Sequence, residues 1–256
     1  MNSYLNNQSL FRTRLLDGDE LVGMFIKTPH YSMTEVMANS ELDFLVIDRE
    51  HGAIDLAAMD AGIMAGRSAD MPIFVRIQQN TATGMLYPLD CGATGVIVPH
   101  VATRDKAEEI AGGGRYRNGN RGFAGTPRAG GYGTREMHEY IDAADAESTI
   151  VAQIEDIEAV ENIEEIVKVK EIDCLFLGRM DLTVGYDAKS TSDDVVMDAV
   201  KHVCKVARNA DKALAAYAGI NELDMLRELG VTMFALGSEH SLVQAGIKNT
   251  LERFKA

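Results

Sequence analysis

The stretch Phe44–Gly52 reads FLVIDREHG, an apolar run that ends abruptly in charged residues. Residues 44–47 are apolar at every position, which is typical of a parallel strand buried on both faces. Asp48, Glu50 and His51 follow directly. In barrel enzymes the catalytic groups lie where strands lead into the following loops. These residues therefore indicate either part of an active site or an ordinary charged surface turn.

The same kind of apolar segment recurs along the whole chain, alternating with segments of helical spacing. The other expected strands cover residues 21–26, 73–75, 95–98, 149–153, 172–177, 212–217 and 231–236. Eight strand–helix repeats in 256 residues are the count and size of a (β/α)8 TIM barrel, so we expect one α/β domain over residues 1–256. A doubly wound open sheet is the alternative, but no G-x-G-x-x-G motif follows any of these strands.

The connections include one long irregular segment, residues 112–133, which is rich in glycine and carries Arg115, Arg117, Arg121 and Arg128. A loop of this length in a compact domain is usually functional or mobile, and a disordered surface insert is the alternative. Residues 156–169 are expected to form one helix, and a final helix is expected to run to about residue 254.

The composition is that of an ordinary globular protein, with 46% apolar and 25% charged residues. No run of about 18 apolar residues is present, and the first residues lack the apolar block of a signal peptide, so we expect a cytoplasmic protein. The net charge of −14 argues against nucleic acid and anionic membranes as partners, because phosphate binding relies on clustered Lys and Arg. Cys91, Cys174 and Cys204 form no C-x-x-C pair, which predicts reduced, buried thiols.

Further polar residues follow the third, fifth and sixth expected strands, and a barrel gathers them at the same end as Phe44–Gly52. They are Arg76, Gln153, Glu155 and Asp181. Taken singly, each has a plain structural explanation, such as a surface charge or a carboxylate that stabilises a helix N-terminus by up to about 1 kcal/mol. Two carboxylates, a histidine and an arginine at one end of one barrel together favour an active site.

These residue types are suited to one kind of chemistry. Two carboxylates without cysteine or several histidines favour a hard octahedral cation such as Mg²⁺ or Mn²⁺, completed by water and substrate oxygens. A 2-oxo acid supplies two such oxygens, and a cation on its ketone oxygen stabilises an enolate. Arg76 is suited to the same oxygen or to the carboxylate, and His51 to proton transfer near neutral pH. Asp90 is a candidate to orient the His51 imidazole if the fold brings the two together.

Several motifs resemble those of the HpcH/HpaI metal-dependent class II aldolases. They are IDREHG (47–52), VRI (75–77), LDCGATGVIVP (89–99), QIE (153–155) and LGRMDL (177–182). Their order and spacing cover nearly the whole chain. The resemblance implies a TIM barrel, commonly a hexamer (a trimer of dimers) with exchanged C-terminal helices. It also implies a divalent metal ion, with Co²⁺ as an alternative to Mg²⁺ or Mn²⁺.

The resemblance also implies an activity, the reversible cleavage of a 4-hydroxy-2-oxo acid to pyruvate, or a related 2-oxo acid, and an aldehyde. Glu155 and Asp181 would then be the metal ligands, and Arg76 would stabilise the pyruvate enolate. His51, hydrogen-bonded to Asp90, would be the general base. The substrate-binding residues would be Gln153, Gly178, Arg179 and Met180, with Asp48 and Glu50 supporting the site.

The chain departs from this family at Arg179 and Met180, where members usually have a proline and a small residue. A bulky pair here affects the pocket for the pyruvate carboxylate, and therefore the identity of the substrate more than the type of reaction. Oxaloacetate decarboxylation and acyl-CoA cleavage are alternatives within the same superfamily. A barrel that binds a metal–oxoacid complex without catalysis is the alternative from a different class.

Overall fold

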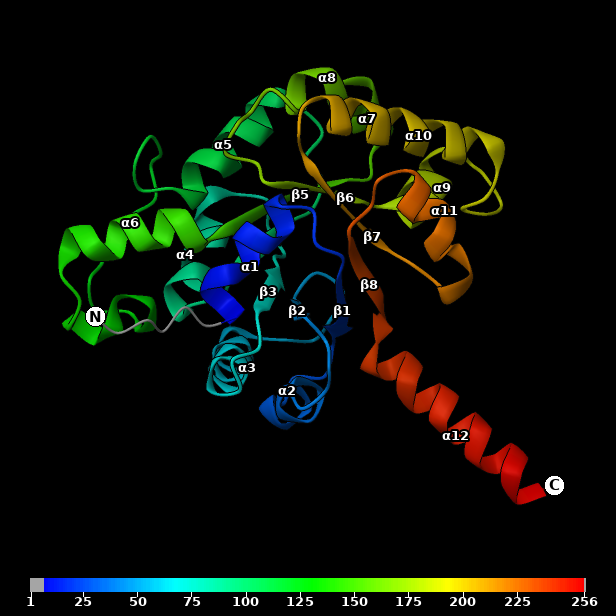
Figure 1. Cartoon of the computed structure of the whole chain (residues 1–256), viewed down its shortest axis with the longest axis horizontal. Coiled ribbons are helices and arrows are strands. Elements are labelled where there is room, and N and C mark those ends of the chain that lie inside the picture. The colour runs from blue at the N-terminus through cyan, green and yellow to red at the C-terminus, as the bar shows by residue number, and fades with distance from the viewer. Residues whose placement is uncertain (1–6, 256) are drawn as a thin grey trace.

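Eight parallel strands close into a barrel in the computed structural model, which describes residues 7–255 (Figure 1). Each strand pairs with the next along the chain, and β1 pairs with β8 to complete the ring. This confirms the predicted α/β TIM barrel. The strands are β1 (Leu21–Ile26), β2 (Phe44–Asp48), β3 (Ile73–Arg76), β4 (Gly95–Val98), β5 (Thr149–Ile154), β6 (Cys174–Leu177), β7 (Ala213–Tyr217) and β8 (Met233–Ser238).

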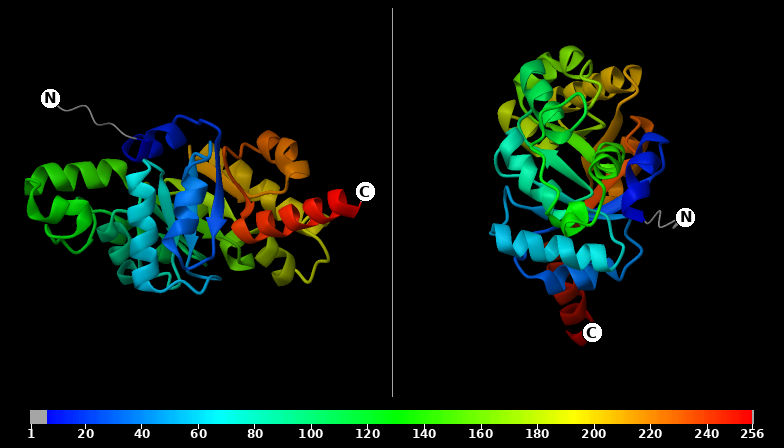
Figure 2. Two further views of the ribbon diagram at one scale, coloured as in Figure 1. Left: turned by 90° about the horizontal axis from the view of Figure 1, so that it is seen from below. Right: turned by 90° about the vertical axis from the view of Figure 1, so that its left-hand side faces the viewer.

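Helices connect the strands and surround the barrel (Figures 1 and 2). They are α1 (Asn7–Leu16), α2 (Tyr31–Ala38), α3 (Leu56–Ser68), α4 (Ala82–Cys91), α5 (Arg104–Gly114), α6 (Met137–Glu147), α7 (Ile157–Glu161), α8 (Ile163–Ile166), α9 (Arg179–Gly185), α10 (Asp194–Asn209), α11 (Leu223–Glu228) and α12 (Glu239–Lys255), with short 3-10 turns η1 (Arg128–Gly133) and η2 (Ile220–Glu222). The prediction of one helix over 156–169 is wrong, because the chain bends at Asn162, which ends α7 and precedes α8. The Asn162 side chain donates to the Ala102 carbonyl, which holds the bend against the neighbouring connection.

The strands are buried on both faces, as the continuous apolar runs predict. In β2, Leu45 and Ile47 belong to the cluster between the sheet and the helices, whereas Phe44 and Val46 belong to the cluster inside the barrel. The inner cluster is closed at one end by α1, whose Phe11 ring contacts the Phe44 and Phe74 rings at centroid distances of 5.8 and 4.9 Å. One end of the barrel is therefore filled with aromatic side chains.

The glycine-rich segment 112–133 is held to the barrel by arginine side chains rather than forming a detached insert. Arg115 pairs with Asp173 at 2.8 Å, and Arg121 pairs with Asp90 at 2.9 Å. Arg128 donates to Asp60 at 3.0 Å. Several charge-assisted contacts of this kind order a segment that has few apolar side chains of its own.

The last helix, α12, extends away from the barrel in both views (Figures 1 and 2). Its first residue, Glu239, is buried and accepts hydrogen bonds from the backbone N–H groups of Lys27 and Thr28 at 2.7 and 2.6 Å. Beyond this anchor its apolar side chains are exposed, namely Leu242, Val243, Ile247, Leu251 and Phe254.

Two further sequence predictions concern the thiols and the membrane. Cys91, Cys174 and Cys204 are free and buried, as predicted. Among residues 7–255, no helix combines the length and the apolar character needed to span a bilayer.

Candidate active site

The alternation of side chains along the strands places a polar layer at the carboxyl end of the barrel. Phe25, Phe44, Val46, Phe74, Val151 and Phe176 point into the barrel. Because inward positions recur every second residue, the next inward residues are Lys27, Asp48, Arg76, Gln153 and Gly178. The sequence thus directs one lysine, one aspartate, one arginine and one glutamine to a single ring above an apolar interior. This ring contains four of the residues predicted for the site.

Asp48 and Arg76 form a buried, two-point ion pair within this ring. Arg76 donates from Nε to Asp48 Oδ1 at 3.0 Å and from Nη2 to Oδ2 at 2.7 Å, and Asp48 is fully buried. The Arg76 guanidinium also lies over the Phe25 ring, 4.8 Å from its centroid. Burial alone would raise the pKa of Asp48, but the hydrogen bonds and charge of Arg76 lower it overall. Asp48 therefore stays ionised and fixes the direction of the guanidinium.

Glu155, in contrast, is paired with no arginine or lysine of residues 7–255. It is 3% exposed, and its carboxylate accepts hydrogen bonds from the Gln153 side chain and, at 2.8 Å, from the His100 backbone N–H. Burial raises the pKa of Glu155 to about 7, and the contacts with His100 and Gln153 only partly oppose this. The Oε1 atom of the buried Gln153 has no hydrogen-bond partner among the described residues. These carboxylate and amide oxygens are suited to a hard cation.

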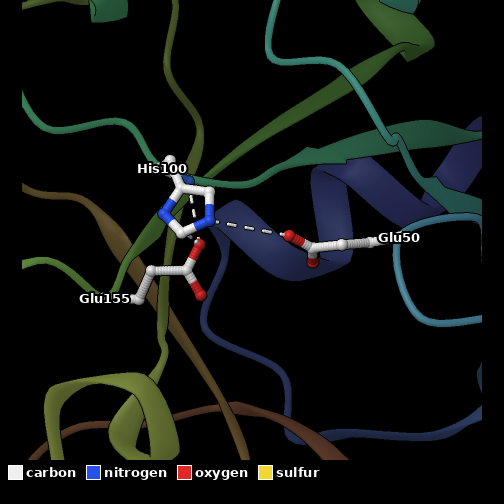
Figure 3. Close-up of side chains that lie close together, drawn as sticks. All are labelled: Glu50, His100 and Glu155. Atoms are coloured by element: carbon white, nitrogen blue, oxygen red, sulfur yellow. Dashed lines mark hydrogen bonds and ion pairs between the residues drawn. The ribbon is translucent and has the colours of Figure 1, made fainter. Parts of the chain in front are cut away.

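His100 belongs to this group of side chains, although it was not among the predicted site residues. Figure 3 shows its imidazole between two carboxylates, with Nδ1 3.5 Å from Glu155 Oε1 and Nε2 3.8 Å from Glu50 Oε1. Ligand atoms of Glu50, His100 and Glu155 all lie within 4.8 Å of one another. His100 also contacts Asp156, and its backbone has a positive φ of 53°. The sequence contained one indication of this role, because His100 follows the fourth expected strand by two residues, at the end of the barrel where the site lies.

A cavity of about 440 Å³ opens beside this cluster and is lined by most of the predicted substrate-binding residues. Asp181, in the first turn of α9, is exposed and contributes to the cavity wall. His51 also lines the cavity, and its side chain is 58% exposed, with Nε2 3.8 Å from Glu50 Oε2. The remaining predicted site residues on this wall are Arg76, Gln153, Gly178, Arg179 and Met180.

The side chains of the unusual pair Arg179 and Met180 differ in burial, since Arg179 is buried and Met180 is exposed. Arg179 is 5% exposed, and its guanidinium donates to Glu222 Oε1 at 2.8 Å and to the Tyr217 carbonyl at 3.1 Å. Met180 is 65% exposed. Gly178, before them, packs so closely on Glu155 that an added Cβ would collide with the Glu155 Cβ. The glycine is therefore required for the carboxylate to occupy its position.

The expected hydrogen bond between His51 and Asp90 is absent from the described part of the chain. Asp90, at the end of α4, instead pairs with Arg121 at 2.9 Å. Arg121 is brought there by the fold of segment 112–133, which the local sequence around Asp90 does not reveal. Within one chain, Asp90 therefore orients Arg121 rather than the His51 imidazole.

Comparison with known proteins agrees with this geometry. The family profile described as HpcH/HpaI aldolase/citrate lyase matches residues 21–245. The chain belongs to this family. It is 27% identical to a hydroxypyruvate/pyruvate aldolase of Paraburkholderia phytofirmans, covering 96% of this chain and 97% of that protein. It is 29% identical to a 5-keto-4-deoxy-D-glucarate aldolase of Shigella boydii, covering 96% of each.

A solved structure of an HpcH/HpaI family protein from Burkholderia cenocepacia superposes with a TM-score of 0.91 at 25% identity, covering 97% of this chain and 100% of that one. The family resemblance seen in the motifs is thus confirmed, as is the prediction that the protein is a lyase of the aldolase type. Aldolases of the HpcH/HpaI family depend on a divalent metal ion and act on small molecules.

Proposed function

We propose that this HpcH/HpaI family member reversibly cleaves a 4-hydroxy-2-oxo acid to pyruvate, or a closely related 2-oxo acid, and an aldehyde. The observation that carries the proposal is the position of Arg76, which Asp48 fixes from below at the wall of the 440 Å³ cavity. No hydrogen bond from Arg76 Nη1 to a described residue is present, so this donor is free for an anionic substrate oxygen. The names of the two aldolase relatives support the same reaction.

The residues at this site fit a divalent cation. We assign Glu155 and Asp181 as its protein ligands, and Mg²⁺ or Mn²⁺ as the preferred ions with Co²⁺ as an alternative. The fit rests on the buried Glu155 carboxylate and on Gln153 Oε1 beside it. Within the described part of the chain, the first has no Arg or Lys partner and the second has no hydrogen-bond partner. When bound, such a cation acts as a Lewis acid toward the carbonyl group of the substrate.

The side chains of the chain itself then divide the remaining work. Arg76 binds the oxygen on which negative charge develops, because its guanidinium is always charged and is held in one direction. His51, exposed at the cavity wall, accepts and returns the proton as general base, because imidazole is the side chain best suited to proton transfer near neutral pH. Asp48 positions Arg76, and the Glu50 carboxylate lies beside Arg76 and His51. Gln153, Gly178, Arg179 and Met180 shape the substrate pocket.

The assembly and location are part of the same proposal. The exposed apolar side chains of α12 favour a helix that packs on another copy of the chain, consistent with a homo-oligomer, a hexamer with exchanged C-terminal helices. We further propose a cytoplasmic location, with no nucleic acid or membrane as partner, in keeping with the net charge of −14 and the reduced cysteines.

Exchange of the pyruvate methyl protons in D2O tests the reaction without knowledge of the aldehyde. The protein should exchange these protons with Mg²⁺ or Mn²⁺ and not after chelation. Asp181→Asn and Glu155→Gln should abolish exchange, whereas Glu35→Gln, an exposed glutamate on α2, should leave it unchanged. Absence of exchange with every metal would indicate a binding protein rather than an enzyme. Full exchange by either variant after chelation would show that the substituted residue is wrongly assigned as a metal ligand.

A further inference from the structure

A second cavity, of about 240 Å³, lies at the opposite end of the barrel from the candidate active site. Two of its lining residues, Thr94 and Ser148, directly precede β4 and β5, so they mark the amino ends of these strands. Gln8 of α1, the helix that closes this end, also lines it. The cavity is therefore separated from the candidate active site by the length of the barrel.

The second cavity is strongly cationic although the chain as a whole is acidic. Three arginines line it, Arg67 from α3, Arg121 from segment 112–133 and Arg135 just before α6, while Glu147 is the one carboxylate on its wall. Among the described residues, neither Arg67 nor Arg135 forms an ion pair. With Asp90, which pairs with Arg121, three guanidinium groups and two carboxylates leave an excess of one positive charge in a protein of net charge −14.

Arg121 supplies a buried donor that has no partner. Its side chain is only 1% exposed, and Nη2 donates to Asp90 at 2.9 Å while the guanidinium stacks on the Tyr116 ring, 4.5 Å from its centroid. Its Nε atom has no hydrogen-bond partner among the described residues. A buried donor without a partner is costly, and an oxygen atom of a ligand removes that cost.

Arg67 is held in place and is repelled by its neighbours. Its Nη1 donates to the Gly92 carbonyl at 3.1 Å and to the Gln8 side chain at 3.3 Å. Burial and the charges of Arg128 and Arg135 lower the pKa of Arg67. Burial raises the pKa of Glu147, although the charges of Arg135 and Arg67 oppose this. The repulsion of Arg67 by Arg128 and Arg135 indicates that positive charge is concentrated beside this cavity.

We infer that this cavity binds the phosphate group of a small metabolite. A phosphate monoester carries about −1.5 to −2 charges near pH 7 and presents three acceptor oxygens, which suit the fork geometry of several arginines at once. A carboxylate carries less charge and presents only two oxygens. The cavity is smaller than the ~300–1,000 Å³ typical of pockets for drug-sized ligands, so the ligand is a small one.

Calorimetric titration of the full-length, metal-free protein at constant ionic strength tests this inference. The probes are glycerol 3-phosphate, inorganic phosphate and acetate. Saturable binding of either phosphate probe, with acetate at least tenfold weaker, is the expected result. Tighter binding of glycerol 3-phosphate identifies an ester as the ligand, and tighter binding of inorganic phosphate identifies the free ion. Absence of saturable binding, or equal affinity for acetate, overturns the inference.

Three variants locate the binding site. Arg135→Gln changes an exposed side chain and should weaken phosphate binding about tenfold or more, as expected for loss of a charge-assisted contact. Glu147→Gln should tighten binding, because it removes a repelling carboxylate without removing a donor. Arg253→Gln, an equal charge change on the exposed end of α12, should have no effect. If neither Arg135→Gln nor Glu147→Gln changes binding, the anion binds elsewhere and the inference is overturned. The same conclusion follows if Arg76→Lys, in the candidate active site, abolishes binding.

Discussion

Replacing Glu155 with glutamine should stabilise the metal-free protein above neutral pH, even though the change removes a proposed metal ligand. The wild-type carboxylate is 3% exposed, and His100, with Nδ1 at 3.5 Å from Oε1 and a side chain that is 54% exposed, is its ion-pair partner among the described residues. Glutamine has the same shape and no charge. Its amide N–H can donate to Gln153 Oε1, which has no partner among the described residues, once the Gln153 amide has turned over from its present position as donor to Glu155.

The size of the effect follows from the pKa of Glu155, which burial raises from its ordinary value of 4.5 to about 7. This carboxyl group binds its proton more tightly in the folded than in the unfolded chain. Its contribution to stability is therefore fully present below about pH 4.5 and is lost as the pH rises through 7. The difference in the free energy of unfolding should be near zero at about pH 4.5. It should grow to about 3 kcal/mol in favour of Glu155→Gln at about pH 8, at ~1.4 kcal/mol per pKa unit.

Urea denaturation with a chelator present, at one protein concentration and a series of pH values, measures this difference. Glu35→Gln is the matched control, and its effect should stay within about 0.5 kcal/mol at every pH because the side chain is exposed. Added Mg²⁺ or Mn²⁺ should stabilise the wild-type protein and not Glu155→Gln. A variant that is less stable than the wild type at about pH 8, or a difference independent of pH, would refute the argument.

Three further changes probe the other parts of the site. Arg76→Ala leaves the fully buried Asp48 with Lys27, at 3.5 Å, as its remaining cationic partner, so it should lower the free energy of unfolding by up to about 3–5 kcal/mol in urea denaturation, and Arg76→Lys by less. His51→Asn should slow turnover by about 10²–10⁴-fold, because the proton-transfer group is lost, without changing metal affinity measured by calorimetry. Arg179→Ala frees Glu222 and enlarges the pocket, so it should shift the ratio of kcat/KM values toward bulkier aldehydes.

The sequence predicts the barrel and the polar ring above its interior because both follow from local patterns. Apolar runs identify the strands, and the alternation of side chains places Asp48, Arg76 and Gln153 on the inner face of β2, β3 and β5. Parallel strands present their carboxyl ends at the same edge of the barrel, so residues far apart in sequence meet there. This part of the site requires no knowledge of the loops.

The parts of the site that the sequence did not predict depend on how the loops fold. Asp90 pairs with Arg121, a residue of segment 112–133, and Arg179 is drawn inward by Glu222, which is 43 residues further along the chain. His100 reaches the Glu155 carboxylate because its backbone has a positive φ of 53°. Strand alternation says nothing about these positions, since each lies beyond the end of a strand.

The two buried carboxylates of the site have opposite environments, and this difference assigns their roles. Asp48 receives two hydrogen bonds from Arg76 that lower its pKa, so its charge is already balanced inside the protein. Among the described residues, Glu155 accepts hydrogen bonds only from the Gln153 amide and the His100 backbone N–H, with the half-exposed His100 ring 3.5 Å away. Burial raises its pKa, so its charge is less well balanced than that of Asp48. A cation that enters the site gains little from Asp48 and most from Glu155. This difference supports the proposed roles, with Asp48 positioning Arg76 and Glu155 as a ligand of the metal ion.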